Sequence, residues 1–384
     1  MEQTFEVPPN QFVLERVPAN ARRPLRAWDA ADAMALEALA DLEIDEGGLV
    51  IVGDRFGALT CALRQLNPVV ASESAAAREA ISANLLTNGL APVETQSVLD
   101  GFDRNFSAAV IRVPKARNEL IDTLHRLRPH LDEGAVVVGA AMDKHLERSF
   151  LDCFNELVGP AELSRASRKA RLITARLDAS LDPGPSPWPV TWRAHGATLF
   201  NHGSGFSPTK LDVGTDLLLR SLDENVDEWT AIDQPRIVDL GCGNGIVGIR
   251  LATALAAAGA GGEVVAIDDD ASALDAATRS WAASIEPETS VGVSYRHHHR
   301  LVEVCEPASV DLVVVNPPFH DDRVVGDETA WSMFVDSHNV LKPGGSLVVV
   351  GNRHLGYHAK LAKIFGNSDT LTSNAKFVVL RSQR

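Results

Sequence analysis

The sequence predicts an α/β fold made of two tandem domains, each with a largely parallel sheet covered by helices. Short β-branched runs alternate with alanine-rich helical stretches along the chain, which is the pattern of buried parallel strands joined by helices. The length of 384 residues suits two domains at about 150 residues each. Residues 182–189 carry prolines at alternate positions, which prevent a helix and favour a stiff, extended connection. We therefore expect one domain over residues 1–185 and another over residues 186–384.

The composition is that of a soluble globular protein, with 45% hydrophobic and 23% charged residues, and it excludes collagen-like, disordered and coiled-coil chains. The longest apolar runs, residues 254–260 and 347–351, are much shorter than the roughly 20 residues that a bilayer requires. The four cysteines form no Cys-x-x-Cys pair, which indicates neither a zinc site nor a disulfide framework. Residues 1–10 lack the features of a signal or transit peptide. We expect a cytoplasmic protein with no membrane contact and no metal.

Strand-like runs in the second half precede a final antiparallel hairpin, and the first half repeats this order in weaker form. Residues 49–57 resemble residues 237–245, and residues 134–139 resemble residues 345–351. We interpret the first domain as a degenerate copy of the second, although any two α/β domains share glycine-ended strands. The predicted strands of the second half are 236–240, 263–267, 311–315 and 346–351, with the hairpin at 369–372 and 376–381.

A glycine-rich turn after the strand at 236–240 predicts a cofactor site. Gly241, Gly243 and Gly245 allow a tight turn and a close approach of the backbone to a ligand. Asp239 precedes these glycines, and Asp268 ends the next strand, 23 residues after Gly245, where a carboxylate can accept both hydroxyls of a ribose. This spacing resembles the signature of S-adenosylmethionine methyltransferases more than a dinucleotide motif. The alternative is a plain strand-to-helix turn with a solvated acid.

The next chemical motif, Asn316-Pro317-Pro318-Phe319, follows the strand predicted at 311–315. This string is typical of methyltransferases that act on an amino group conjugated to an acyl or aromatic system. The Asn316 side-chain oxygen and the Pro317 carbonyl can each accept a hydrogen bond from such an amine. Phe319 offers a stacking face worth about 1–3 kcal/mol for a base. The alternative is a proline turn after a core strand.

The first domain lacks both motifs. Arg55 stands where the second domain has Gly243, and a bulky side chain there would occupy the space of the cofactor. Arg112 and Lys115 replace the amine acceptors of the second domain with cations, which suit phosphate. We expect the first domain to bind no cofactor.

The formal charge of −15 argues against a protein that coats nucleic acid by bulk attraction, so an RNA partner must be met by local basic clusters. Each cluster alone could equally be a solvated face, and their joint action on RNA phosphates is a hypothesis. One cluster is Arg112, Lys115 and Arg117, and another is Arg165, Arg168, Lys169, Arg171 and Arg176. The third is residues 342–384, which contain seven Lys or Arg, including Arg353, and one acidic residue, Asp369.

Taken together, these motifs resemble the RlmG family of guanine-N2 methyltransferases of large-subunit ribosomal RNA, close relatives of the small-subunit enzyme RsmC. The resemblance covers nearly the whole chain, and its C-terminal part favours the large-subunit enzymes. Besides the motif at 316–320, it is carried by residues 28–32, 352–357, 363–367 and 374–380.

The resemblance implies two Rossmann-like class I methyltransferase domains, the first degenerate and assisting RNA binding, the second catalytic with S-adenosylmethionine. The implied reaction is methylation of the exocyclic N2 amine of a guanine in 23S ribosomal RNA. Residues 206–215 look like the family segment that closes over the cofactor, so Phe206, Asp212, Gly214 and Thr215 are candidate cofactor residues.

One departure from the family concerns the adenine end of the cofactor. Relatives usually carry Asp or Asn there, whereas this chain has histidine at positions 297–299 followed by Arg300. We expect backbone groups to recognise the adenine. Neighbouring residues of an extended chain point to opposite faces, so the three histidines predict a solvated loop rather than a metal site.

Three alternative functions remain open on the sequence. The enzyme could methylate guanine N2 of 16S ribosomal RNA, as RsmC does, or a different amine such as adenine N6 or a protein glutamine, although those families prefer Tyr at the Phe319 position. From another class, the chain could be an RNA-binding ribosome-assembly factor without catalysis. The intact turn from Asp239 to Gly245 and the presence of Asn316 argue against this last function.

Overall fold

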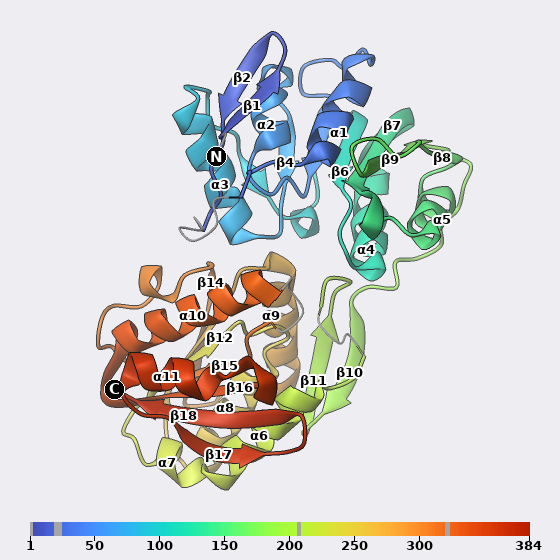
Figure 1. Cartoon of the computed structure of the whole chain (residues 1–384). Helices are drawn as coiled ribbons and strands as arrows, with labels where there is room; N and C mark the ends of the chain where they lie inside the picture. The colour runs from blue at the N-terminus through green and yellow to red at the C-terminus, as the bar shows by residue number, and fades with distance from the viewer. Residues whose placement is uncertain (1–2, 19–24, 206–208, 319–322) are drawn as a thin grey trace. The chain divides into compact units, whose positions relative to one another are not determined.

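The computed structural model describes residues 3–18, 25–205, 209–318 and 323–384, with the side chains of residues 323–327 left out of the description. The chain divides into two compact units, Met1–Trp188 and Pro189–Arg384. Each contains one seven-stranded α/β sheet (Figure 1). The predicted fold class, two tandem domains of one methyltransferase-like topology, is confirmed.

The C-terminal unit has the strand order β14-β13-β12-β15-β16-β18-β17. The first five strands run parallel, and β18 pairs antiparallel with both β16 and β17, so the predicted hairpin is confirmed. The central strands are buried on both faces, which explains their continuous valine and isoleucine content. The strands are β12 (Arg236–Leu240), β13 (Gly262–Asp268), β14 (Val291–His297), β15 (Val310–Val315), β16 (Leu341–Asn352), β17 (Asp369–Ser373) and β18 (Phe377–Gln383).

Helices cover both faces of this sheet. On one face α6 and α8 pack against alternate strand residues such as Ile237, Val314 and Val350. On the other face α10 and α11 pack against the intervening residues, including Val313 and Val349. The helices are α6 (Val213–Glu224), α7 (Val226–Thr230), α8 (Ile246–Ala257), α9 (Ala271–Ser284), α10 (Arg323–Val340) and α11 (Tyr357–Phe365).

The β10–β11 hairpin (Val190–Ala194 and Ala197–Asn201) precedes α6 and lies against α9. The backbone N–H groups of Thr198 and Phe200 donate to the hydroxyls of Ser284 and Ser280, each at 2.9 Å. These bonds tie the hairpin to the helix that follows the second strand of the sheet.

The N-terminal unit repeats the topology with the order β5-β4-β3-β6-β7-β9-β8. A separate hairpin, β1 (Thr4–Val7) and β2 (Asn10–Val13), precedes it. The sheet strands are β3 (Leu49–Val52), β4 (Val69–Ala71), β5 (Thr95–Gln96), β6 (Phe106–Arg112), β7 (Leu131–Met142), β8 (Ala161–Leu163) and β9 (Ala170–Arg176); the helices are α1 (Ala30–Ala40), α2 (Ala58–Ala62), α3 (Ala75–Thr87), α4 (Arg117–Leu127) and α5 (Arg148–Leu157).

The strand registers give a residue-by-residue correspondence between the units. Leu240 pairs with Val315 in one sheet, and Val52 pairs with Ile111 in the other. The residue after β15 is Asn316, and the matching residue, at the end of β6, is therefore Arg112.

A helix that precedes the first strand of the seven-stranded sheet also corresponds between the units, α6 in one and α1 in the other. Asp212 caps α6, and Asp29 caps α1, each with its side chain accepting from the backbone of the first turn. The third residue after the cap is Thr215 in α6 and Asp32 in α1.

Within the described residues, no helix is both long and apolar enough to cross a membrane.

Candidate active site

The glycine turn after β12 needs glycine for conformational reasons. Gly241, Gly243 and Gly245 have φ of 72°, 54° and 79°, in the left-handed region that side chains other than glycine rarely adopt. A Cβ on Gly243 would meet no atom within 4 Å, so its backbone borders open space. A Cβ on Gly245 would lie 3.1 Å from Ala277, so this glycine also allows α8 and α9 to pack closely.

Asp268 braces this turn from the end of β13. Its Oδ2 accepts from the Gly243 N–H at 2.9 Å, and its Oδ1 accepts from the Asp270 N–H at 3.0 Å. Each carboxylate oxygen has a further lone pair, which leaves capacity for a ligand hydroxyl. Burial raises the pKa of Asp268 above its usual range, and the neighbouring Asp270 adds to this effect.

Asp239 lies behind the turn instead of facing the open space beside Gly243. It is 3% exposed, and its Oδ2 accepts from the Gly248 N–H at 2.9 Å, which holds the start of α8 against β12. Burial raises the pKa of Asp239 to about 7. A side chain that sequence analysis did not single out, Asn244, is fixed from the β10–β11 hairpin by a 2.9 Å bond to Asn201.

At the end of β15, the Asn316 side chain is held on one side only. Its Nδ2 donates to the Thr215 hydroxyl at 2.9 Å, whereas its Oδ1 is buried and has no hydrogen-bond partner among the residues that the structure describes. Pro317 beside it is buried, whereas Pro318 is exposed. An unpaired buried carbonyl oxygen is costly unless a ligand donor satisfies it.

The start of α6 holds Asn316 in place through Thr215. Asp212 Oδ2 accepts from the N–H groups of Gly214 and Thr215, at 2.8 and 3.1 Å. A Cβ on Gly214 would lie 3.1 Å from the Phe377 ring, so glycine lets the helix start close to β18. The structure thus brings Thr215 to the amine-acceptor motif, a contact that sequence analysis missed, and Asp212 holds the backbone of Thr215 in place. Phe206 and Phe319, predicted to contact cofactor and base, lie outside the described residues.

The histidine tract runs from the last residue of β14 into a loop, as predicted, but this loop is half-buried and not fully solvated. His297 ends β14, and its Nε2 lies 2.8 Å from the carbonyl oxygen of Asp269. His298 and His299 stack with centroids 5.2 Å apart, and Arg300 makes a two-pronged ion pair with Asp336 at 2.8 and 2.9 Å. All four are partly buried, because neighbouring elements supply partners that the sequence does not reveal. No cluster of metal-ligating side chains occurs within the described ranges.

In the N-terminal unit, Arg112 occupies the place of Asn316 but is used internally. Its side chain is 5% exposed and forms ion pairs with Asp29 at 2.8 Å and Asp32 at 3.3 Å. Burial raises the pKa of Asp32 to about 6, although the Arg112 guanidinium acts in the opposite direction. The expectation that Arg112 binds RNA is therefore corrected, because β6 carries it into the interior, where two carboxylates neutralise it.

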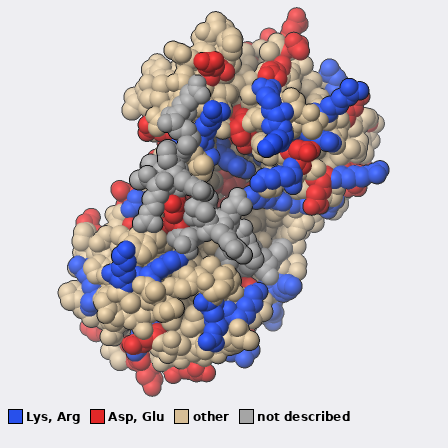
Figure 2. Space-filling view, viewed as in Figure 1, with Lys and Arg blue, Asp and Glu red and all other residues tan. Residues whose placement is uncertain are grey.

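The remaining predicted RNA contacts lie on the surface. Arg168 and Lys169 form the tight turn before β9 with φ of 50° and 64°, and Arg168 contacts Glu37 at 2.7 Å. Lys115, Arg165 and Arg353 are exposed, and Arg353 donates to the Asn374 carbonyl at 3.1 Å. Figure 2 shows that Lys and Arg side chains gather in groups, with acidic side chains among them.

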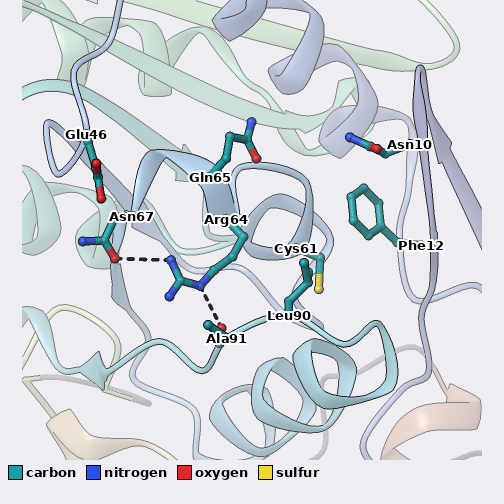
Figure 3. Close-up of a pocket in the computed structure, with 9 residues that line it drawn as sticks. All are labelled: Asn10, Phe12, Glu46, Cys61, Arg64, Gln65, Asn67, Leu90 and Ala91. Atoms are coloured by element: carbon teal, nitrogen blue, oxygen red, sulfur yellow. Dashed lines mark hydrogen bonds between the residues drawn. The ribbon is translucent and has the colours of Figure 1, made fainter.

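A separate pocket in the N-terminal unit is not part of this site. Arg64 within it is held by the Ala91 carbonyl at 2.8 Å and by Asn67 at 3.2 Å (Figure 3). Glu46 and Asn67 precede β3 and β4, so the pocket lies at the amino ends of these strands. Ligands of open α/β sheets bind at the carboxyl ends instead.

Comparison with known proteins decides the family. The model of the RLMG N-terminal domain matches residues 2–179, and that of the methyltransferase small domain matches residues 196–381. The ribosomal RNA large subunit methyltransferase G of Streptomyces avermitilis is 40% identical, over 100% of this chain and 99% of the relative. The chain belongs to the ribosomal RNA large subunit methyltransferase G family. The family member from Shewanella amazonensis is 35% identical, over 97% of this chain and 96% of its own.

The fold of this methyltransferase G family member also matches a solved structure. The 16S rRNA N2 methyltransferase RsmC of T. thermophilus, in complex with AdoMet and guanosine, aligns with a TM-score of 0.74 and 22% identity. The alignment covers 99% of this chain and 97% of that one. The C-terminal unit is an S-adenosylmethionine-dependent methyltransferase domain. The N-terminal unit shares its topology and two turn glycines, Gly53 and Gly57, but has Arg55 in place of Gly243 and Arg112 in place of Asn316.

Proposed function

We propose that the protein transfers a methyl group from S-adenosylmethionine to the exocyclic N2 amine of a guanine in 23S ribosomal RNA. The observation that carries this proposal is the unpaired, buried Oδ1 of Asn316, an acceptor held beside Pro317 at the carboxyl end of β15. The relatives are named ribosomal RNA large subunit methyltransferase G, which supports the choice of RNA.

The residues at the ends of β12 and β13 fit the cofactor. The open space beside Gly243 accepts a ligand against the backbone, and Asp268 has lone pairs left for ribose hydroxyls. S-adenosylmethionine supplies an electrophilic methyl group there. Asp239 contributes indirectly, since it fixes the start of α8 under the turn.

The chain's own residues act on the amine. The lone pair of a guanine N2 is delocalised into the ring, which makes the nitrogen a weak nucleophile. Acceptors at Asn316 Oδ1 and the Pro317 carbonyl bind its two N–H groups and favour a pyramidal nitrogen whose lone pair points at the methyl group. The surplus proton leaves after transfer, so no general base is required before attack. We assign Phe319 to stacking on the base.

Surface cations provide the RNA contacts in this proposal. Lys115, Arg165, Arg168, Lys169 and Arg353 are exposed and can neutralise phosphates despite the net charge of −15. We assign the N-terminal unit to RNA binding because it retains the fold without the acceptor asparagine. The four cysteines are free and buried, which suits the reducing cytoplasm in which ribosomes are assembled.

The test combines incorporation and mapping. Protein-free 23S and 16S ribosomal RNA from a strain lacking the gene are incubated with tritiated S-adenosylmethionine and either the wild-type protein or Asn316→Ala. We expect label at one guanine of 23S RNA with the wild-type protein and a rate lower by about 10²–10³ with the variant. Label in 16S RNA would favour the small-subunit alternative, and binding of RNA without incorporation would favour an assembly factor.

A further inference from the structure

We propose that Asn352 is a second substrate-reading residue, whose side-chain oxygen accepts a hydrogen bond from the N1–H of the target guanine. This inference rests on the proposed function and names the group that selects guanine over other purines. Asn352 is the last residue of β16, which pairs with β15, the strand that Asn316 directly follows.

The first observation is an unused acceptor in the interior. Asn352 is 9% exposed, and its Oδ1 is buried with no hydrogen-bond partner in the part of the chain that the structure describes. A neutral acceptor left unsatisfied in this way costs about 1–3 kcal/mol. In the C-terminal unit, Asn316 and Asn352 are the two asparagines whose buried Oδ1 atoms lack a partner within the described ranges.

The second observation is that both acceptors face the same side of the sheet. Val315 pairs with Val349, so Asn316 lies beside Val350 and Asn352 is two residues further along β16. Val314 and Val350 pack into the core cluster under α6 and α8, and residues at alternate positions share a face. Asn316 and Asn352 therefore lie on the face of α6, which agrees with the bond from Asn316 to Thr215.

The third observation comes from the N-terminal unit, where both asparagines are absent together. The pair Ile111–Gly139 corresponds to the pair Val315–Val349 of the C-terminal unit. Met142, three residues after Gly139, therefore stands at the position of Asn352. Met142 packs against the apolar core of its unit, and Arg112 stands in for Asn316. The unit that lacks the reaction motif thus has neither free acceptor.

The chemistry of the base explains why two acceptors are needed. Guanine presents two neighbouring donors on its Watson–Crick edge, the N2 amine and N1–H, whereas 2-aminopurine keeps the amine but has a lone pair at N1. An acceptor at Asn352 pairs with guanine N1–H and faces an unpaired lone pair in the analogue. Sites that hydrogen-bond a substrate reject analogues that lack the partner group more strongly than apolar sites do.

The experiment uses the full-length protein and fragments of 23S ribosomal RNA that span the mapped position, synthesised with guanine or 2-aminopurine there. We expect the wild-type kcat/KM to be about 10- to 100-fold higher for guanine than for 2-aminopurine. In Asn352→Ala the preference should fall to about twofold or less, through loss of rate on guanine alone. Asn352→Asp, which keeps an acceptor, should retain a preference of at least about fivefold.

Asn225→Ala is the matched control, since it removes the same group from the far end of α6, where Asn225 Nδ2 donates to Ser221. It should keep the wild-type preference. An undiminished preference in a folded Asn352→Ala protein that binds S-adenosylmethionine normally would overturn the role of Asn352; if this variant does not fold, a preference lost in Asn352→Asp would do so. Failure of the wild-type protein to methylate the guanine fragment would overturn the proposed function itself and this inference with it.

Discussion

The hydrogen bond from Asn316 Nδ2 to Thr215 Oγ1, 2.9 Å long, joins two residues that are 101 positions apart in the chain. Because the hydroxyl takes the amide N–H, the amide oxygen is the atom left free. Arg112 and Asp32 occupy the corresponding places in the N-terminal unit, where an ion pair of 3.3 Å replaces the hydrogen bond. One structural position thus serves as an acceptor site in one unit and as a buried charge pair in the other.

Thr215 is predicted to orient Asn316. Thr215→Val keeps the shape but removes the hydroxyl, so the amide can rotate; we expect kcat for RNA methylation to fall about tenfold, as for the loss of one hydrogen bond. Thr215→Ser should restore the rate. The measurement is single-turnover methylation alongside calorimetric S-adenosylmethionine affinity, which should change less than twofold. A loss confined to cofactor affinity would instead assign Thr215 to the cofactor.

Cofactor binding should depend on Gly243 and Asp268. Asp268→Ala removes hydrogen bonds to a charged group, so S-adenosylmethionine affinity should weaken about 10- to 100-fold in calorimetry. Gly243→Arg, which copies the residue of the N-terminal unit, should abolish binding because the side chain fills the open space. Gly259→Arg is the control: its φ of 71° imposes comparable strain at the end of α8, and it should bind normally. Tight binding by Gly243→Arg would contradict the site.

Arg112 is predicted to stabilise the N-terminal unit. Arg112→Asn leaves Asp29 and Asp32 without their cation, and removing one partner of a buried pair costs about 3–5 kcal/mol. Chemical denaturation should show this loss in the transition of residues 1–188. The double variant Arg112→Asn with Asp32→Thr, which installs the C-terminal pair, should recover part of it. A double variant no more stable than the single one would show that the pair contributes little.

His202 and Asp275 make stability depend on pH. His202 is 2% exposed and lies 2.7 Å from Asp275; this bond and that from Arg279 lower the pKa of Asp275 to about 2. A carboxyl with a lowered pKa stabilises the fold above its unfolded value of 3.8, and the effect disappears as pH falls through 2. Asp275→Asn should therefore lower the free energy of unfolding by about 1 kcal/mol at pH 6. The difference in unfolding free energy from the wild-type protein should disappear between pH 4 and pH 2. A difference in unfolding free energy that does not change with pH would contradict the role of the Asp275 charge.

RNA affinity should depend on the turn before β9. Reversing both charges, Arg168→Glu with Lys169→Glu, should weaken binding to 23S ribosomal RNA at least tenfold and lower the salt slope by about two. Filter binding at several salt concentrations measures both quantities. Arg104→Glu with Arg220→Glu, two exposed cations each paired with an acid, serves as the charge-matched control. Equal effects of the two variants would mean that only the total charge matters.

The strands and the glycine turn could be predicted from the local residue pattern. The predicted strand 236–240 is β12, because valine and isoleucine in a short run followed by glycine have few other outcomes. Contacts between residues distant in the chain could not be predicted from that pattern. Arg112 looked like part of a surface cluster because its carboxylate partner Asp29 is 83 residues away. The histidine tract looked solvated for the same reason, since the carbonyl oxygen that His297 contacts belongs to Asp269, 28 residues away.

The buried pair of Arg112 with Asp32 also limits which substitutions the N-terminal unit can accept. A buried arginine at this position needs carboxylates beside it, which Asp29 and Asp32 supply. A single substitution to asparagine would leave the buried Asp32 and the half-buried Asp29 without their cation, and Arg55 would still stand in place of the middle turn glycine. Installing the acceptor site of the C-terminal unit here would therefore take coordinated changes at Arg112, Asp32 and Arg55, because each change alone leaves another part of the site incompatible.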